Sequence, residues 1–531
     1  LPPAGLWLAV RRKGMSAGSG NGRVGPPASA EVLLVSGPGV PGGEREVCQL
    51  AAAHPGATAL AGGAATVQAV SAGLDRADAS AIEAGPPEDY VVRRFAVRGR
   101  RHRHVVWRPP GGVDWRRVDR DMAAVVREVA KVWGELPYRH YSFLTHVAAD
   151  YAGGLEHRNS TVLGADPAHL QSDEKLQTRF LPLVAHEFFH TWNVKRILPA
   201  AFQPYDLQRE SYTDLLWLFE GFTSYYELPI LYRAKVCDDE AFGKMLGEDL
   251  EMYNKAIGRR RLGVSQASRL AWTLLYQPHE HNINRNVSYY TKGMWVALVL
   301  DAELRRRKVP GGLDAVMRHM WRKHGRTGMG VTDDAFPDLV EQATGIDLRA
   351  KIEAWTRGTA ELPIDPSLRL LGWNVKRDWK DPKRKIGLGV EFKPGAGASG
   401  APIIARIWED AAAFQVLQPD DEMVAAVGYK WKADHFHEQV AGKRKGDTVE
   451  VNVFREGRLR TLPVPLSELP PDKVTVTKRK GDAAATRRRK DWIGEGRPKP
   501  KATAKRIPLI QDAGKAARLA AVAPRGRHTR Y

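Results

Sequence analysis

The chain has 531 residues, a formal net charge of +20 and only two cysteines, Cys48 and Cys237. Two cysteines exclude a disulfide framework and a thiolate zinc site. A composition of 43% hydrophobic and 27% charged residues excludes a wholly disordered protein. No run of 18 apolar residues is present in the sequence, so a membrane-spanning helix is not expected.

The positive charge is concentrated at the two ends of the chain. Residues 471–531 carry 18 Lys and Arg against 5 Asp and Glu, and residues 1–110 carry 13 against 8, so the middle is nearly neutral. Blocks of like charge are usually solvated and disordered, and this tail has only Trp492 and Tyr531 as aromatic residues that could stack on bases. We therefore predict a disordered basic tail over 471–531, with nucleic-acid binding through it as a less favoured alternative.

Residues 1–90 are rich in Gly, Ala and Pro, with short and isolated apolar runs. Such a segment buries too little apolar surface to offset its ordering entropy, so we predict that it is mostly disordered. Residues 91–113 contain Val-rich stretches that are typical of the strands of a small sheet. The first ten residues do not form a convincing secretory signal, so a cytoplasmic location is expected, with a periplasmic one left open.

Helical periodicity begins at about residue 114. Apolar residues then recur at spacings of three and four, which predicts one buried helix face: Val118, Met122, Val125, Val129 and Val132. A strand is predicted over 141–147, and four helical segments between 176 and 358, among them Tyr212–Pro229 and Lys292–Lys308.

After Gly372 the pattern changes to short Val- and Ile-rich runs separated by Gly and Pro. Strands are predicted over 386–392, 403–407, 423–427 and 449–454, with a short helix over 436–440. The predicted fold class is thus α+β and multidomain, with a mostly helical domain over 114–365, a small β-rich domain over 372–470, and disordered terminal segments.

The sequence His186-Glu187-Phe188-Phe189-His190 is an HExxH motif. On a helix, positions i and i+4 share one face, so both imidazoles can bind one zinc ion while Glu187 lies beside it as a general base. The alternative is a surface helix with two unrelated histidines. Apolar neighbours favour a buried helix and therefore the zinc site: Leu181, Leu183, Val184, Phe188, Phe189 and Trp192.

A catalytic zinc site needs a third protein ligand and one open position. The candidates are Glu210, Glu220 and Glu227. Glu220 lies in the strongly apolar segment 217–226, where an unpaired carboxylate would be costly, so it is the predicted ligand. Glu210 and Glu227 are interpreted as solvated charges.

The segment HEFFHTWNVKRILPAAFQPYDLQRESYTDLLWLFEGFTSYY, which begins at His186, resembles the signature of the glycyl aminopeptidase family of gluzincin metallopeptidases. The resemblance implies a thermolysin-like catalytic domain, one Zn²⁺ per chain bound by His186, His190 and Glu220, and Glu187 as the general base. It also implies a C-terminal PDZ domain. The family has a sizeable β-rich domain near the N-terminus. Residues 1–90 here do not have the pattern of strands, and the resemblance implies that residues 91–113 are the remnant of such a domain.

Two further segments resemble the family. Gly153-Gly154-Leu155-Glu156-His157 matches a substrate-binding edge strand, and the resemblance implies that Glu156 holds the free α-ammonium of a peptide; the alternative is an ordinary turn. Val287–Gly293 matches a segment in which a Tyr hydroxyl stabilises the oxyanion. Tyr290 is the predicted donor and Tyr289 its substitute, and packing at a helix start is the alternative.

In the β-rich region, Gly387-Leu388-Gly389-Val390 resembles the carboxylate-binding loop of PDZ domains, which implies a site for a peptide C-terminus. The alternative is a PDZ domain that only packs on its neighbour.

Together, these patterns predict a zinc-dependent aminopeptidase that hydrolyses N-terminal residues, Gly or Ala among the candidates, from peptides with a free N-terminus. The alternatives are an inactive or zinc-free PDZ scaffold that binds peptide C-termini and, less favoured, a protein that binds nucleic acid through its basic tail.

Overall fold

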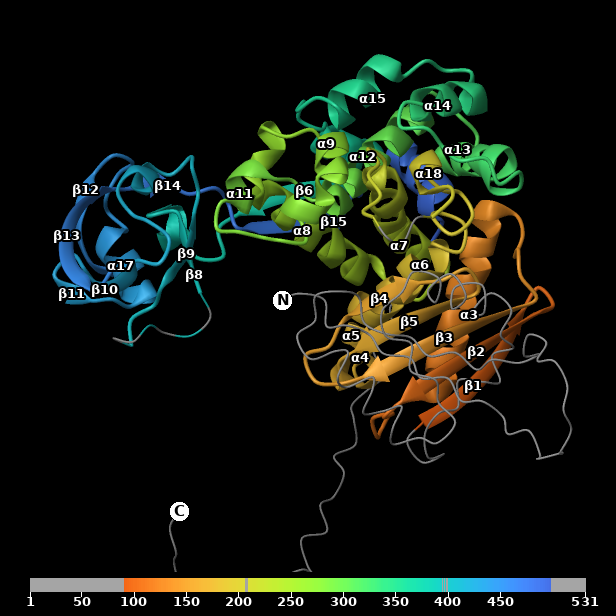
Figure 1. Cartoon of the computed structure of the whole chain (residues 1–531), viewed down its shortest axis with the longest axis horizontal. Helices are drawn as coiled ribbons and strands as arrows, with labels where there is room; N and C mark the ends of the chain where they lie inside the picture. The colour runs from red at the N-terminus through yellow and green to blue at the C-terminus, as the bar shows by residue number, and fades with distance from the viewer. Residues whose placement is uncertain (1–89, 206–208, 394, 396, 398–399, 498–531) are drawn as a thin grey trace, which may run out of the picture. The chain divides into compact units, whose positions relative to one another are not determined.

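The computed structural model describes residues 90–205, 209–393, 395, 397 and 400–497. The segments predicted to be disordered, 1–89 and the final part of the tail from 498, lie outside the described residues. The described part combines a five-stranded sheet, a large helical region and a β-rich unit with its own hydrophobic core (Figure 1).

The five-stranded sheet has the order β1-β2-β3-β5-β4. β1 and β2 form an antiparallel hairpin, β2–β3 and β3–β5 are parallel, and β4 is antiparallel to β5, so β4 is an end strand of this sheet. Because β2 pairs with β3, the predicted boundary at 113 does not separate two structural units. The strands are β1 (Tyr90–Val97), β2 (Arg100–Trp107), β3 (His140–Val147), β4 (Gly153–Glu156) and β5 (Ser160–Ala165).

The helix α3 (Trp115–Trp133) connects β2 to β3, and its prediction is confirmed. Asp114 caps its N-terminus by accepting a hydrogen bond from the backbone N–H of Arg117, and Gly134 ends it with a φ of 92°. All five residues of the predicted apolar face are at most 1% exposed. This face packs against α6 (Leu181–Phe189).

The helical region is divided into more segments than predicted. The helix predicted over Tyr212–Pro229 begins only at Trp217, as the π-helical segment η5 (Trp217–Gly221), and continues as α7 (Phe222–Arg233). The helix predicted over Lys292–Lys308 is α12 (Tyr289–Arg306). The remaining α-helices here are α4 (Pro167–Gln171), α5 (Asp173–Lys175), α8 (Asp239–Lys255), α9 (Val264–Arg269), α10 (Ala271–Leu274), α11 (Asn282–Arg285), α13 (Leu313–Met320), α14 (Phe336–Thr344), α15 (Arg349–Thr356) and α16 (Ile364–Leu370).

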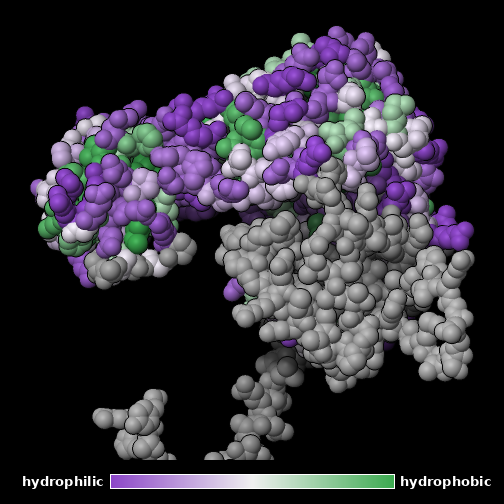
Figure 2. Space-filling view, in the orientation of Figure 1, coloured by the Kyte–Doolittle hydropathy of each residue, from purple (hydrophilic) through white to green (hydrophobic). Residues whose placement is uncertain are grey.

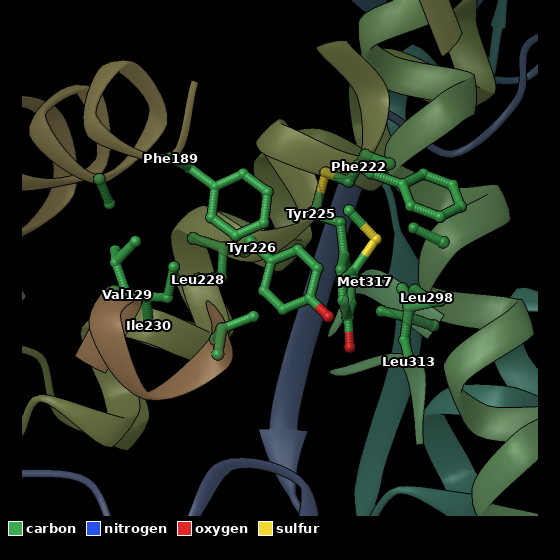
Figure 3. Close-up of a cluster of buried hydrophobic side chains, with 14 of the residues drawn as sticks. Val129, Phe189, Phe222, Tyr225, Tyr226, Leu228, Ile230, Leu298, Leu313 and Met317 are labelled. Carbon is green, nitrogen blue, oxygen red and sulfur yellow. The ribbon is translucent and has the colours of Figure 1, made fainter. Parts of the chain in front are cut away.

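Aromatic residues join α6 to α7 in the core (Figure 3). The rings of Phe189 and Tyr226 stack with their centroids 4.6 Å apart. Two tyrosine hydroxyls of α7 are buried and donate hydrogen bonds to neighbouring helices, Tyr225 to Asp301 at 2.5 Å and Tyr226 to Asp314 at 2.8 Å. Because buried hydroxyls are costly unless paired, these bonds fix α7 relative to α12 and α13.

The β-rich unit contains the predicted strands and the predicted short helix. The segment predicted as one strand over 386–392 is split by Leu388 and Gly389, since Gly389 has a φ of +70°. Its elements are β7 (Ile386–Gly387), β8 (Val390–Phe392), β9 (Ile404–Ile407), β10 (Glu422–Ala426), β11 (Tyr429–Lys430), α17 (Ala433–Val440), β12 (Thr448–Arg455), β13 (Arg458–Pro465) and β14 (Ser467–Glu468).

The prediction that the chain is disordered from 471 was wrong for residues 473–493. β15 (Lys473–Lys478) pairs with β6 (Trp373–Asp378), and α18 (Ala483–Ile493) follows. β15 packs closely on α8 because two positions of that helix are glycines. A Cβ at Gly243 would lie 2.3 Å from the carbonyl oxygen of Val476, and one at Gly247 would lie 2.6 Å from that of Val474. The many Lys and Arg residues of 471–531 favour a prediction of disorder, whereas the alternation of apolar and polar residues over 473–478 is typical of a strand.

Several basic residues of this segment have structural partners. Lys478 forms an ion pair with Asp239 at 2.9 Å, and Arg488 and Arg489 donate hydrogen bonds to the carbonyl oxygens of Leu370 and Gly372. These contacts reduce the number of cations available for phosphate binding in 473–493.

Among the residues that Figure 2 colours by hydropathy, hydrophilic ones predominate and hydrophobic ones form small, separate areas. Among the described residues, no helix is both long and apolar enough to cross a membrane.

Candidate active site

The two histidines of the HExxH motif lie at the C-terminal end of α6, and Glu220 faces them from η5. His186 Nε2 lies 3.3 Å and His190 Nε2 3.2 Å from Glu220 Oε2. One ligand atom from each of the three residues fits within 4.8 Å of the others. The structure therefore brings together the three residues that the sequence predicts as zinc ligands.

The other nitrogen of each imidazole is held by an acceptor. His186 Nδ1 lies 2.7 Å from Glu227 Oε1, and His190 Nδ1 lies 2.6 Å from the carbonyl oxygen of Asn193. Because both acceptors take a proton from Nδ1, Nε2 is the nitrogen of each imidazole that faces Glu220 and, once deprotonated, the one that can bind a metal. The interpretation of Glu227 as a solvated charge was wrong, since its carboxylate orients His186.

Charges in this cluster stabilise one another. Burial opposes protonation of His186, but hydrogen bonds to Glu220 and Glu227 outweigh it and raise its pKa well above the usual value. Burial also acts to raise the pKa of Glu220, but His190 and His186 hold it well below the usual range. When the Nε2 protons leave, as metal binding requires, two imidazoles and an ionised carboxylate converge on one point, and this donor set fits a zinc ion.

Glu187 lies on α6 between the two histidines and is 4% exposed. Burial raises its pKa to about 7, while the two neighbouring imidazoles act in the opposite direction. Its Oε2 has no hydrogen-bond partner among the described residues. A carboxylate with a pKa near neutrality can accept and return a proton, as a general base requires.

Strand β4 packs directly on Glu187. A Cβ at Gly154 would lie 2.3 Å from Glu187 Oε1, so only glycine leaves room for the carboxylate. Gly153, with a φ of +121°, has a backbone conformation that favours glycine, although a Cβ there would meet nothing within 4 Å. The two adjacent glycines thus have different roles, one conformational and one steric.

Glu156 ends β4 and reaches the same cluster. Its carboxylate, that of Glu187 and the imidazole of His190 place one atom each within 4.8 Å of the others. Lys195 Nζ lies 3.1 Å from Glu156 Oε1. The predicted anchor for a substrate ammonium is therefore close to the candidate metal ligands and already has a cationic partner.

Tyr289 and Tyr290 begin α12, where Ser288 caps the helix by accepting a hydrogen bond from the N–H of Thr291. The Tyr290 ring lies 6.3 Å from the His186 ring, and the two tyrosine rings stack at 4.7 Å. Burial, followed by the charge of Glu220, raises the pKa of Tyr290 well above the usual value, so the hydroxyl keeps its proton. Tyr289 is 2% exposed, and its hydroxyl lies 3.3 Å from that of Tyr276.

Two motif glycines bring η5 and α12 into close contact. A Cβ at Gly221 would lie 2.4 Å from the Cα of Gly293, and one at Gly293 would lie 2.4 Å from the carbonyl oxygen of Trp217. Both obstacles are backbone atoms, which cannot move aside as side chains can. These glycines therefore allow Glu220 and Tyr290 to approach the same site.

Asn193 is a further residue to which the sequence analysis assigned no role. Its Nδ2 donates to the carbonyl oxygens of Leu218 at 3.2 Å and Phe219 at 3.1 Å, so it ties the turn after α6 to η5. The sequence signals are its position three residues after His190 and its place in the segment that resembles the family, and neither reveals its partners.

The predicted carboxylate-binding loop of the β-rich unit lies between β7 and β8. Leu388 is buried at 3% exposure, and the carbonyl oxygen of Gly389 accepts a hydrogen bond from the N–H of Trp408 at 3.0 Å. A Cβ at Gly387 would lie 2.9 Å from the Leu469 side chain. The loop therefore packs tightly, and it belongs to a different core from the histidine cluster.

Comparisons with known proteins support a peptidase. A family model described as M61 glycyl aminopeptidase matches residues 179–296, which include both histidines and Glu220. A crystal structure of an aminopeptidase N family protein from Idiomarina loihiensis is similar over 76% of this chain and 70% of that chain, with 28% identity and a TM-score of 0.69.

Other similarities are weaker. An M1 zinc metallopeptidase from Deinococcus radiodurans matches 52% of this chain and 53% of that chain at 16% identity, with a TM-score of 0.31, which is too low to support an argument. A search of curated proteins gave no match. The family match and the Idiomarina structure together support an aminopeptidase-like fold and a peptidase function for this chain.

Proposed function

We propose that the chain is a zinc-dependent aminopeptidase of the glycyl aminopeptidase type, a gluzincin of the HExxH class that removes N-terminal residues from peptides. The observation that carries the proposal is the convergence of His186, His190 and Glu220 within 4.8 Å of one another, with Glu187 beside them. The family match over 179–296 supports the same assignment.

Each residue of the candidate site is assigned one role in peptide hydrolysis. A zinc ion bound by His186, His190 and Glu220 would act as a Lewis acid that activates water and polarises the scissile carbonyl. Glu187 takes the proton from the attacking water and returns it to the leaving amine as the C–N bond breaks. The Tyr290 hydroxyl donates to the carbonyl oxygen as negative charge develops on it.

Selection of the N-terminus is assigned to β4. Glu156 accepts a charge-assisted hydrogen bond from the α-ammonium of the substrate, which places the first peptide bond beside Glu187. Because β4 ends the described sheet, its free edge is available for an extended peptide to pair with the strand through Gly153 and Gly154.

The test is the hydrolysis of a panel of aminoacyl arylamides, glycyl and alanyl included, with and without a chelator. Chelator-sensitive cleavage is expected, and Glu187→Gln is expected to abolish turnover while zinc, measured by elemental analysis, stays bound. Full activity of Glu187→Gln, or no chelator-sensitive cleavage of any substrate, would contradict the proposal. A chain without stoichiometric zinc would instead favour the scaffold alternative.

For the β-rich unit we propose a PDZ module that binds a peptide C-terminus through Gly387, Leu388, Gly389 and Val390. The order of strand, Leu-Gly loop, strand and a later helix α17 beside β7 supports it. Fluorescence anisotropy with labelled peptides that differ only in a free or amidated C-terminus tests this role, since a PDZ site requires the free carboxylate.

A further inference from the structure

Lys195 lies in the turn that follows α6, five residues after His190. Its backbone N–H donates to the carbonyl oxygen of His190 at 2.9 Å, so the start of its side chain is fixed relative to the candidate metal ligands. Its ammonium extends to Glu156 Oε1 at 3.1 Å. The Lys195 side chain is 26% exposed and that of Glu156 is 17% exposed.

At 3.1 Å the Lys195 ammonium and the Glu156 carboxylate form an ion pair, and each side chain is shielded from most of the solvent. The negative charge that would select a cationic N-terminus is therefore already compensated by a cation of the chain itself.

We propose that Lys195 is a specificity-determining residue, because its ammonium competes with the α-ammonium of the substrate for the carboxylate of Glu156. This inference rests on the proposed aminopeptidase function. An incoming ammonium must either displace Lys195 or share Glu156 with it, and both reduce the affinity for a free N-terminus.

The geometry allows the displacement. The lysine side chain has four rotatable bonds and reaches solvent, so it can leave the carboxylate without movement of the backbone. The same ammonium opposes the binding of a second metal ion by Glu156, Glu187 and His190. A cation bound there would lie close to the positive charge of Lys195 and be repelled by it. Lys195 therefore favours a single metal ion at the site.

The inference is tested by calorimetric titration of the zinc-loaded full chain with two zinc-binding ligands, glycine hydroxamate, which has a free amine, and acetohydroxamate, which has none. Lys195→Met is expected to bind glycine hydroxamate about tenfold more tightly than the wild type, the size of one charge-assisted hydrogen bond. Acetohydroxamate should bind both equally well, and Lys195→Arg, which keeps the cation, should retain the wild-type affinities.

Weaker or unchanged binding of glycine hydroxamate to Lys195→Met, or equal changes for both ligands, would overturn the inference. If Lys195→Met does not fold, as judged by thermal unfolding, Lys195→Gln is expected to give the same result. In the wild type, the competition predicts that glycine hydroxamate binds less than about tenfold more tightly than acetohydroxamate; a larger preference would also overturn it. Failure of both ligands to bind the zinc-treated chain would refute the proposed function instead.

Discussion

Replacement of Gly154 by alanine tests whether the position of the Glu187 carboxylate depends on β4. Gly154 has no positive φ, so alanine can adopt its backbone conformation. The new Cβ would lie 2.3 Å from Glu187 Oε1 and 2.5 Å from its Cγ, whereas ordinary contacts are about 3.4–4 Å. The carboxylate must therefore move by about 1 Å or more.

Displacement of a catalytic group by about 1 Å can reduce the rate about 100-fold. We expect Gly154→Ala to lower kcat for glycyl and alanyl arylamides by about that factor. The zinc content should stay stoichiometric, because the three atoms nearest to the added Cβ all belong to Glu187 and not to the candidate ligands. Glu187 is only 4% exposed, so little free space is available for relaxation. Steady-state kinetics and elemental analysis of the same preparation measure both quantities.

Gly111→Ala is the matched control, since Gly111 also has no positive φ and a Cβ there would meet nothing within 4 Å. It should keep the wild-type kcat. A Gly154→Ala protein that binds zinc fully and turns over within a few-fold of the wild-type rate would refute the reasoning that β4 positions Glu187.

Two further predictions concern the metal and the acid stability of the fold. Glu227→Gln removes the anionic acceptor of His186 Nδ1–H and should weaken zinc binding by about 10- to 100-fold in a chelator competition; unchanged affinity would show that Glu227 does not support the ligand. His104 is fully buried, and burial lowers its pKa to about 3, so the unfolded chain binds a proton near pH 6.5 that the folded chain does not. Its contribution to stability is present above pH 6.5 and is lost as the pH falls, by about 2 kcal/mol between pH 6.5 and 5. His104→Gln should flatten the pH dependence of the free energy of unfolding, measured by urea titration, by that amount, and an unaltered slope would contradict the assignment.

Local patterns predicted the elements whose signal is periodic. The apolar spacing from Val118 to Val132 predicted α3, and the Val- and Ile-rich runs after Gly372 predicted the strands of the β-rich unit. Periodicity failed where charge dominated the composition. The many Lys and Arg residues after 470 predict a disordered tail, although Val474 and Val476 of β15 alternate with polar residues and are buried against α8.

The sequence alone determined the identities of the candidate ligands, because His186 and His190 are one helical turn apart and Glu220 lies in a segment too apolar to leave a carboxylate unpaired. Only the tertiary structure decided which residues support them. Glu227 is 41 positions from His186, Lys195 is 39 positions from Glu156, and the mutual fit of Gly221 and Gly293 joins helices far apart in the chain. Contacts of this kind depend on how packed elements approach one another, and no local spacing in the sequence encodes that approach.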